Sequence, residues 1–350
     1  MIKFRASGLI NAPKNLIYRA LNKPLKPRLL VIMVTDKCNS HCTQCNIWQQ
    51  KPINNPLSPE EIGTALLSPV FNDVEQIIIT GGECTLRDDL YEIIVYIKIA
   101  LPKVKIIIST NGLLPDRVKD LVERLKSRDI CISVGTSLDG VGSSHDEIRG
   151  VPGNFKKVDV LLGSLPNTDK SVGFVLSELT VDNLPYVRGY LKQFGLKPFV
   201  QWCSGGTFYG NNDEVVSDSE FIVRSLKCYK AVQSLDSKEA GNLLIKNAWL
   251  KLLIGESFKF PCFALHKFAV LKCNGDIAPC LVHFENSIGN IREQSPEEIW
   301  NSDKVLLERK CIKYCEGCLN SWGAGESYYA AFYPYLQYLK KPKEIWRALK

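Results

Sequence analysis

The chain has 350 residues, 45% of them hydrophobic, and a formal net charge of +7. That is enough apolar material for one large domain and a smaller one. No apolar run is as long as a membrane-spanning helix, which needs about 18 residues. No signal-peptide pattern is present either, so we expect a cytoplasmic protein. The 13 cysteines then indicate metal or redox chemistry rather than disulfides.

Residues 1–28 predict a basic, helical lead-in. A solvated helix is the favoured interpretation, and peripheral contact with an anionic membrane or an acidic partner is the alternative. The basic residues that flank the apolar Leu16, Ile17 and Tyr18 are Lys14, Arg19, Lys23, Lys26 and Arg28.

Short apolar runs alternate with segments of helical length between residues 29 and 217. The runs are rich in Ile and Val, which is typical of buried parallel strands. Six such units predict an α/β fold, a partial (β/α)6 parallel barrel with its active site where the strands end. The predicted strands are 29–35, 76–80, 104–109, 130–137, 172–177 and 198–203, and the predicted helices are 59–67, 90–100, 116–127, 155–165 and 183–194.

Cys38, Cys42 and Cys45 form a C-x3-C-x2-C pattern directly after the first predicted strand. Three thiolates on one loop can hold three irons of a [4Fe–4S] cluster and leave the fourth iron free to take a reactive ligand. A zinc knuckle or reduced structural thiols are the alternative. Zinc sites usually add a second pair of Cys or His close by, and none occurs between this loop and Cys84.

This pattern and its position resemble the radical S-adenosylmethionine (SAM) superfamily. The resemblance implies a site-differentiated [4Fe–4S] cluster, SAM as cofactor, and a flavodoxin- or ferredoxin-type protein as reductant. It also implies that SAM is cleaved reductively to a 5′-deoxyadenosyl radical, which abstracts hydrogen from a C–H bond of the substrate. The motifs that carry the resemblance lie between residues 29 and 203.

Gly81, Gly82 and Glu83 follow the second predicted strand and resemble the GGE motif of this family. Glycines allow a close approach of backbone to a ligand, and the resemblance implies that Glu83 binds the amino group of SAM. The family usually has proline next, where this chain has Cys84.

The residues at two further strand ends resemble segments that contact the cofactor in this family. For the segment 109–112, the resemblance implies that Ser109 and Asn111 contact the ribose hydroxyls of SAM. An ordinary Asn-Gly turn would have the same sequence. Ser137 and Arg149, twelve residues apart, imply contacts to the methionine carboxylate. A structural salt bridge between Arg149 and Asp146 is the alternative.

A helical connector is expected at 218–256, a cysteine-rich domain at 257–325 and an amphipathic tail at 326–350. A hairpin with its turn at Asn274-Gly275 would bring Cys262 back towards Cys280. This region resembles the SPASM extension in its shorter twitch form, which implies one auxiliary [4Fe–4S] cluster. The implied ligands are Cys262, Cys280, Cys315 and Cys318, with Cys311 or Cys273 as possible replacements and zinc as the alternative metal.

A fully ligated auxiliary cluster is suited to passing electrons, so the resemblance favours two-electron oxidation of a small polar metabolite, sugar-like or cyclitol-like. Only 37 residues precede Cys38, which disfavours a peptide maturase unless a separate protein recognises the peptide. A radical epimerase is another alternative, with Cys203 or Cys84 as hydrogen donor. A non-enzymatic metal-binding scaffold for nucleic acid is a remote one, because only the net charge supports it and no nucleic-acid partner is expected.

Overall fold

The computed structural model describes residues 6–203, 209, 223, 261–313, 327 and 330. The predicted connector apart from residue 223, Cys315, Cys318 and the tail apart from residues 327 and 330 lie outside the described residues. Within the described part of the chain, no helix is both long enough and apolar enough to cross a membrane.

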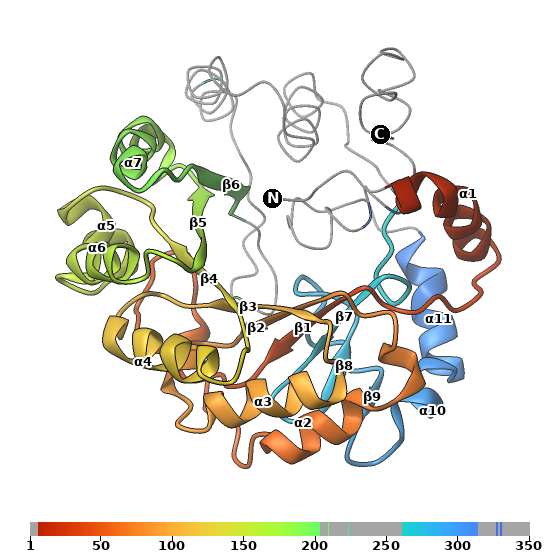
Figure 1. The fold of residues 1–350 in the computed structure, drawn as a ribbon. Coiled ribbons are helices and arrows are strands. Elements are labelled where there is room, and N and C mark those ends of the chain that lie inside the picture. The colour runs from red at the N-terminus through yellow and green to blue at the C-terminus, as the bar shows by residue number, and fades with distance from the viewer. Residues whose placement is uncertain are drawn as a thin grey trace.

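The strands form one sheet in the order β6-β5-β4-β3-β2-β1-β7-β8-β9. Strands β1 to β6 pair in parallel with their neighbours, and no described pairing joins the two edges of the sheet. The curved, open sheet in Figure 1 therefore confirms the predicted partial barrel. The strands are β1 (Leu29–Met33), β2 (Gln76–Thr80), β3 (Lys105–Ser109), β4 (Ser133–Ser137), β5 (Asp169–Leu176), β6 (Pro198–Trp202), β7 (Phe268–Leu271), β8 (Asp276–Ala278) and β9 (Gly289–Asn290).

Helices α2 to α7 lie on the outer side of the curved sheet (Figure 1). A capping box explains the start of α2, where Ser58 accepts from the Glu61 amide and Glu61 accepts in return from the Ser58 amide. The short α5 was not among the predicted helices. The helices are α1 (Ala6–Ala20), α2 (Pro59–Leu66), α3 (Leu90–Ala100), α4 (Pro115–Lys126), α5 (Ser143–Arg149), α6 (Asn154–Ser164), α7 (Leu184–Leu191), α10 (Pro296–Trp300) and α11 (Asp303–Ile312).

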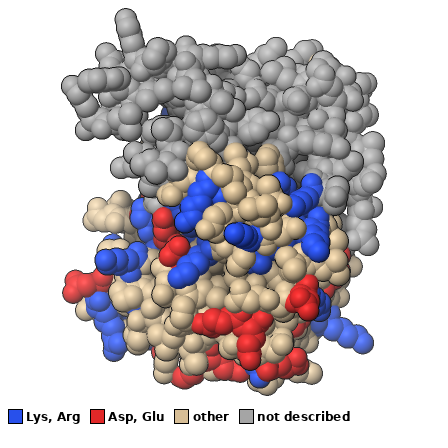
Figure 2. All heavy atoms as spheres, turned by 90° about the vertical axis from the view of Figure 1, so that its right-hand side faces the viewer, with Lys and Arg blue, Asp and Glu red and all other residues tan. Residues whose placement is uncertain are grey.

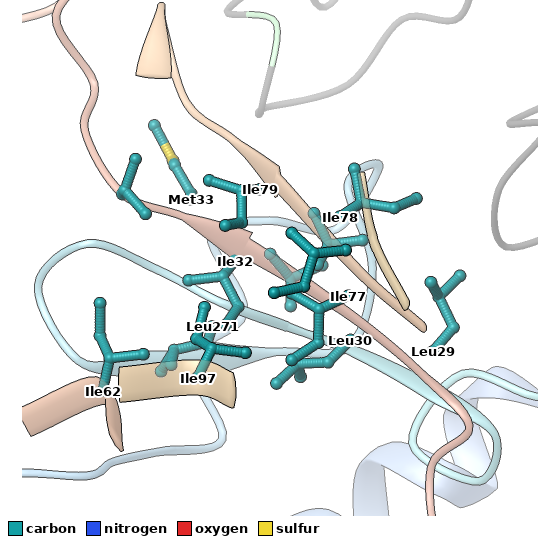
Figure 3. Close-up of a cluster of buried hydrophobic side chains, with 14 of the residues drawn as sticks. Leu29, Leu30, Ile32, Met33, Ile62, Ile77, Ile78, Ile79, Ile97 and Leu271 are labelled. Atoms are coloured by element: carbon teal, nitrogen blue, oxygen red, sulfur yellow. The ribbon is translucent and has the colours of Figure 1, made fainter. Parts of the chain in front are cut away.

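The main core lies where β1 and β2 meet α2 and α3. All five residues of β1 are buried, which is typical of a strand covered on both faces of a sheet. Figure 3 shows Ile62 of α2 and Ile97 of α3 pointing towards side chains of β1, β2 and β7. Burial of this aliphatic cluster fixes the central strands, and hence the loops that leave their ends.

The predicted hairpin at Asn274-Gly275 is confirmed, because β7 and β8 are antiparallel and the Gly275 amide donates to the Lys272 carbonyl at 3.0 Å. Gly275 has a φ of +96°, which favours glycine. The sequence did not predict that β7 also pairs in parallel with β1, from Leu29 opposite Phe268 onwards. The cysteine-rich region thus extends the same sheet.

Candidate active site

The loop that carries the three cysteines, residues 34–46, is here called the cluster loop. Its first part docks on the glycines that follow β2: the Gly82 amide donates to the Thr35 carbonyl, and the Glu83 amide to the Lys37 carbonyl, each at 2.8 Å. A Cβ on Gly81 would lie 2.2 Å from the Thr35 oxygen, and one on Gly82 would lie 2.3 Å from the Lys37 oxygen. Both glycines are therefore required by the approach of the cluster loop itself.

The second part of the cluster loop docks on the end of α5. The amides of His41 and Thr43 donate to the carbonyls of Arg149 and Ile148 at 3.1 and 2.9 Å. These carbonyls have no partner within the helix, so the loop satisfies them. Gly150 ends the helix with a φ of +65°, and a Cβ there would lie 2.3 Å from the His41 oxygen. The cluster loop is thereby held from two sides.

Two of the three cysteine sulfurs of the cluster loop, those of Cys38 and Cys42, receive an N–H group. Such donors stabilise thiolates and tune iron–sulfur clusters. Burial raises the pKa of Cys38 to about 12 and that of Cys45 to about 11, and the neighbouring thiols add to both shifts. The donors are the Ser40 amide to Cys38 at 3.4 Å and Arg149 Nη1 to Cys42 at 3.7 Å.

The chemistry of this set fits a [4Fe–4S] cluster. Among the described residues, no group of three His, Cys, Asp or Glu side chains is arranged to hold a single metal ion, and a cube separates its thiolate ligands more widely than one ion does. Within the same part of the chain, the buried Nε of Arg149 has no hydrogen-bond partner. This N–H group of Arg149 can therefore donate to an anionic group bound beside Cys42.

The carboxylate of Glu83 joins the ends of β2 and β3. Its side chain is only 1% exposed. It accepts from the Thr85 hydroxyl at 2.6 Å, the Thr110 hydroxyl at 2.8 Å and the Asn111 amide at 2.6 Å. Burial raises the pKa of Glu83, and these hydrogen bonds act in the opposite direction. Glu83 therefore fixes the geometry of two strand ends.

Asn111 faces the cluster loop, because its Nδ2 donates to Asn39 Oδ1 at 2.7 Å and to Ser40 Oγ at 2.9 Å. Ser109 and Ser137 are the last residues of β3 and β4 and are half-buried. The predicted cofactor contacts therefore gather at the carboxyl edge of the sheet, beside the three cysteines. In parallel sheets this edge is where ligands bind.

Arg149 forms an ion pair with Asp139, whose side chain is fully buried, at 2.6 Å between Nη2 and Oδ2. The other oxygen of Asp139 accepts from the Val175 amide at 2.9 Å. The alternative of a bridge from Arg149 to Asp146 is wrong. The Asp146 carboxylate instead accepts two backbone amides at the start of α6, each at 2.7 Å, which holds it away from the arginine.

His145 and Asn154 support this arrangement, and both are fully buried. His145 Nδ1 accepts from the Asp139 amide at 3.1 Å, so its Nε2 carries the proton towards Asn154 Oδ1 at 3.1 Å. Asn154 Nδ2 donates to the Asn111 carbonyl at 3.2 Å. The sequence did not predict this network. The one available signal was the position of His145, one helical turn before Arg149.

The two candidate hydrogen donors lie in different surroundings. Cys84 is completely buried, and its Sγ donates to the Ser109 carbonyl at 3.3 Å. Cys203 follows β6 and is half-buried. Burial raises the pKa of Cys203, with a further contribution from the charge of Asp139, and Cys203 also adds to the shift of Cys45. Cys203 therefore lies at the carboxyl end of β6, and Cys84 lies in the core.

Cys262 precedes β7 and Cys280 follows β8, and both are half-buried. Cys280 Sγ accepts from the His283 amide at 3.3 Å. Of the two possible replacements, Cys311 is exposed on α11, whereas Cys273 is buried near Asp36. The hairpin thus presents two of the predicted auxiliary ligands, and the other two lie outside the described residues.

Comparison with known proteins agrees with this geometry. The profile of the radical SAM superfamily matches residues 32–162, and that of the SPASM iron–sulfur cluster-binding domain matches residues 262–319.

Curated relatives include two proteins of Methanosarcina barkeri. The chain is 34% identical to an Fe-coproporphyrin III synthase over 49% of this chain and 42% of that protein. It is 23% identical to an AdoMet-dependent heme synthase over 89% of this chain and 97% of that protein. It is 26% identical to the subtilosin biosynthesis protein AlbA of Bacillus subtilis over 82% of this chain and 62% of that protein. The chain thus spans less than half of the first relative and nearly all of the second.

Among solved structures, SuiB of Streptococcus suis bound to the precursor peptide SuiA has the same fold, with a TM-score of 0.64, 17% identity, and coverage of 89% of this chain and 75% of that one. The two domain matches imply a [4Fe–4S] cluster, auxiliary iron–sulfur clusters and SAM, which confirms the cofactor prediction. The chain belongs to the radical SAM superfamily and carries a C-terminal SPASM domain.

Proposed function

We propose that this enzyme oxidises a substrate by two electrons, beginning with removal of a hydrogen atom from a C–H bond. The observation that carries the proposal is the cluster loop, which holds three cysteines on one short segment at the carboxyl edge of the sheet and gives two of their sulfurs an N–H donor. When bound, the cluster and SAM supply the radical that takes the hydrogen atom. The residues of the chain hold, orient and shield these groups.

Arg149 is the best-placed residue for the carboxylate of SAM. Its guanidinium is oriented by Asp139, contacts Cys42, and keeps an unused Nε donor. A planar guanidinium suits a carboxylate, and preorganisation lowers the cost of binding. Ser137 remains the proposed second contact to this carboxylate, Ser109 the proposed contact to the ribose, and Glu83 the proposed acceptor for the amino group.

Asn111 has a different proposed role, because its side-chain amide already donates to two residues of the cluster loop. We assign it to positioning that loop. Gly81 and Gly82 have a similar role, since they permit the docking of Thr35 and Lys37.

The auxiliary cluster is proposed to contain one [4Fe–4S] unit bound by Cys262, Cys280, Cys315 and Cys318. Four protein ligands leave no iron open to substrate, so the suitable task is accepting an electron. A substrate radical that loses one electron and one proton completes a two-electron oxidation. The proton acceptor is left unassigned.

For the substrate we propose a polypeptide, bound with the help of a separate recognition protein. The similarity to AlbA over 82% of this chain supports this class, as does the shared fold with peptide-bound SuiB. A tetrapyrrole is the second candidate, because the heme synthase matches over 97% of its own length. The sugar-like or cyclitol-like metabolite remains a prediction from the sequence.

Epimerisation is the alternative reaction, with a thiol returning hydrogen to the substrate radical. Cys203 is the better-placed donor, because Cys84 is completely buried. In D2O, a Cys203 donor would leave deuterium in the product, and Cys203→Ala would abolish that incorporation. Unchanged incorporation in Cys203→Ala would remove Cys203 from this role.

The test is anaerobic reconstitution with iron and sulfide, followed by iron counting, electron paramagnetic resonance, and detection of 5′-deoxyadenosine with dithionite and SAM. We expect about eight irons and slow release of 5′-deoxyadenosine. A peptide library and porphyrin substrates are then compared by mass spectrometry for a loss of two hydrogen atoms. Bound zinc with no cleavage of SAM would contradict the proposal.

A further inference from the structure

The N-terminal segment presents a basic and apolar face that the proposed reaction does not use. Seven Lys and Arg residues precede Asp36, the first acidic residue of the chain. We call the basic face the set formed by Lys14, Ile17, Leu21, Lys23 and Lys26. Figure 2 shows Lys and Arg side chains gathered on the upper part of the described surface, over the side where α1 and α11 lie, with Asp and Glu gathered along the lower edge.

The side chains of the basic face are open to solvent. Lys14, Lys23 and Lys26 are exposed, and Ile17 and Leu21 are 56% and 60% exposed. Lys14 and Lys23 lie 5.3 and 5.9 Å from the ring centre of Tyr18. In the part of the chain that the structure describes, no ion pair joins these lysines to a carboxylate.

The opposite side of α1 contacts a predicted ligand of the auxiliary cluster. Arg19 Nε donates to the Cys262 carbonyl at 2.7 Å, and the Arg19 guanidinium lies 5.8 Å from the ring centre of Phe263. Lys313, just after α11, donates to the Ala20 carbonyl at 2.7 Å and ties the end of α1 to the same region. One helix, with a diameter of about 10 Å, therefore carries Lys14 and Ile17 of the basic face and the Arg19 contact to Cys262, and the other residues of the face follow its end at Ala20.

We propose that the basic face docks an acidic one-electron carrier protein that exchanges electrons with the auxiliary cluster. The inference rests on the proposed function, because the auxiliary cluster must return the electron it accepts. In this step the cluster loses one electron and the oxidised carrier gains it. Complementary charge speeds encounter, and a few exposed apolar side chains among basic ones suit a transient complex.

The test measures binding rather than turnover. The reconstituted full-length protein is titrated anaerobically with an oxidised acidic flavodoxin by calorimetry at several salt concentrations. We expect charge reversal in Lys14→Glu/Lys23→Glu/Lys26→Glu to weaken binding about tenfold or more, and added salt to weaken wild-type binding. Lys103→Glu/Lys156→Glu/Lys157→Glu is the matched control, since these lysines are also exposed and lie elsewhere in the chain; it should change the Kd less than about twofold.

Three outcomes would overturn the proposal: no binding by the wild type, equal weakening by both triple variants, or binding only to phosphatidylglycerol vesicles, which would assign the face to a membrane. If the triple variant does not reconstitute, the double variant Lys23→Gln/Lys26→Gln replaces it, and we expect a smaller loss of flavodoxin binding. Release of 5′-deoxyadenosine with dithionite needs no carrier. It therefore separates a failure of docking from a failure of the proposed function.

Discussion

The two cysteine sites differ in how they are built. At the first, all predicted ligands lie between Cys38 and Cys45 on one loop, which backbone contacts fix against Gly82 and α5. At the second, the predicted ligands run from Cys262 to Cys318, and the β7–β8 hairpin separates the first two. A site on one loop depends on how that loop docks, whereas a dispersed site depends on the topology of a whole segment.

The largest expected effect is the loss of the first site. Cys42→Ala removes one of three predicted ligands and one of the partners of Arg149, so 5′-deoxyadenosine formation with dithionite should fall at least about hundredfold. Mass spectrometry of the product and iron counting measure it. Cys131→Ala, at an exposed cysteine away from both sites, is the control. Wild-type activity of Cys42→Ala would refute the ligand assignment.

Damage to the second site should separate cleavage of SAM from oxidation. Cys280→Ala should lower the iron content from about eight to about four, keep 5′-deoxyadenosine formation within about threefold, and abolish two-electron oxidation of the substrate. The comparison variant is Cys311→Ala, at an exposed position of α11. If Cys311→Ala loses the iron and Cys280→Ala keeps it, the ligand set must be reassigned.

The docking of the cluster loop can be broken without touching a ligand. In Gly82→Ala, the new Cβ would lie 2.3 Å from the Lys37 oxygen, so we expect a loss of about 3 kcal/mol in unfolding free energy and less iron at the first site. Gly163→Ala in α6 meets no atom within 4 Å and should stay within about 1 kcal/mol of wild type. Denaturant unfolding checks both variants, and equal stabilities would show that the loop adapts.

The smallest expected effect is the pH dependence of stability that comes from His145, which accepts a hydrogen bond from the Asp139 amide. Burial and then the charge of Arg149 lower the pKa of His145 to about 4. A lowered histidine pKa means that the unfolded state binds the proton more readily, so stability is full above about pH 6.5 and is lost as the pH falls towards 4. From pH 7 to pH 5 this loss is about 2 kcal/mol. His145→Gln should remove that part of the pH dependence, and denaturant unfolding at both pH values measures it. An unchanged pH dependence in the variant would exclude His145 as its source.

Much of the barrel was predictable. The predicted strand 76–80 and helix 90–100 coincide with β2 and α3, because continuous buried Ile-rich runs and helical spacing carry their own signal. The first site was equally visible, since its ligands are neighbours in the sequence. The short α5 was missed, because seven residues rich in Ser and charge lack a recognisable apolar face.

The partners of the site residues were less accessible. The sequence offered Asp146 as the partner of Arg149, on grounds of proximity. The structure places Asp139 there because β4 ends beside the turn that leads into α5. Likewise, nothing in the spacing indicated that His145 and Asn154 join the ends of two strands, since such contacts arise only when the strands lie side by side.

The sequence by itself determined the family, the parallel α/β architecture and the cluster loop, because periodicity and short spacings are local properties that survive in any arrangement of the chain. The tertiary structure alone decided that β7 pairs with β1, that Glu83 links two strand ends, and that α1 lies against Cys262. These contacts join residues far apart in the chain. Burial and hydrogen-bond satisfaction over the whole fold select them, and no single segment encodes that choice.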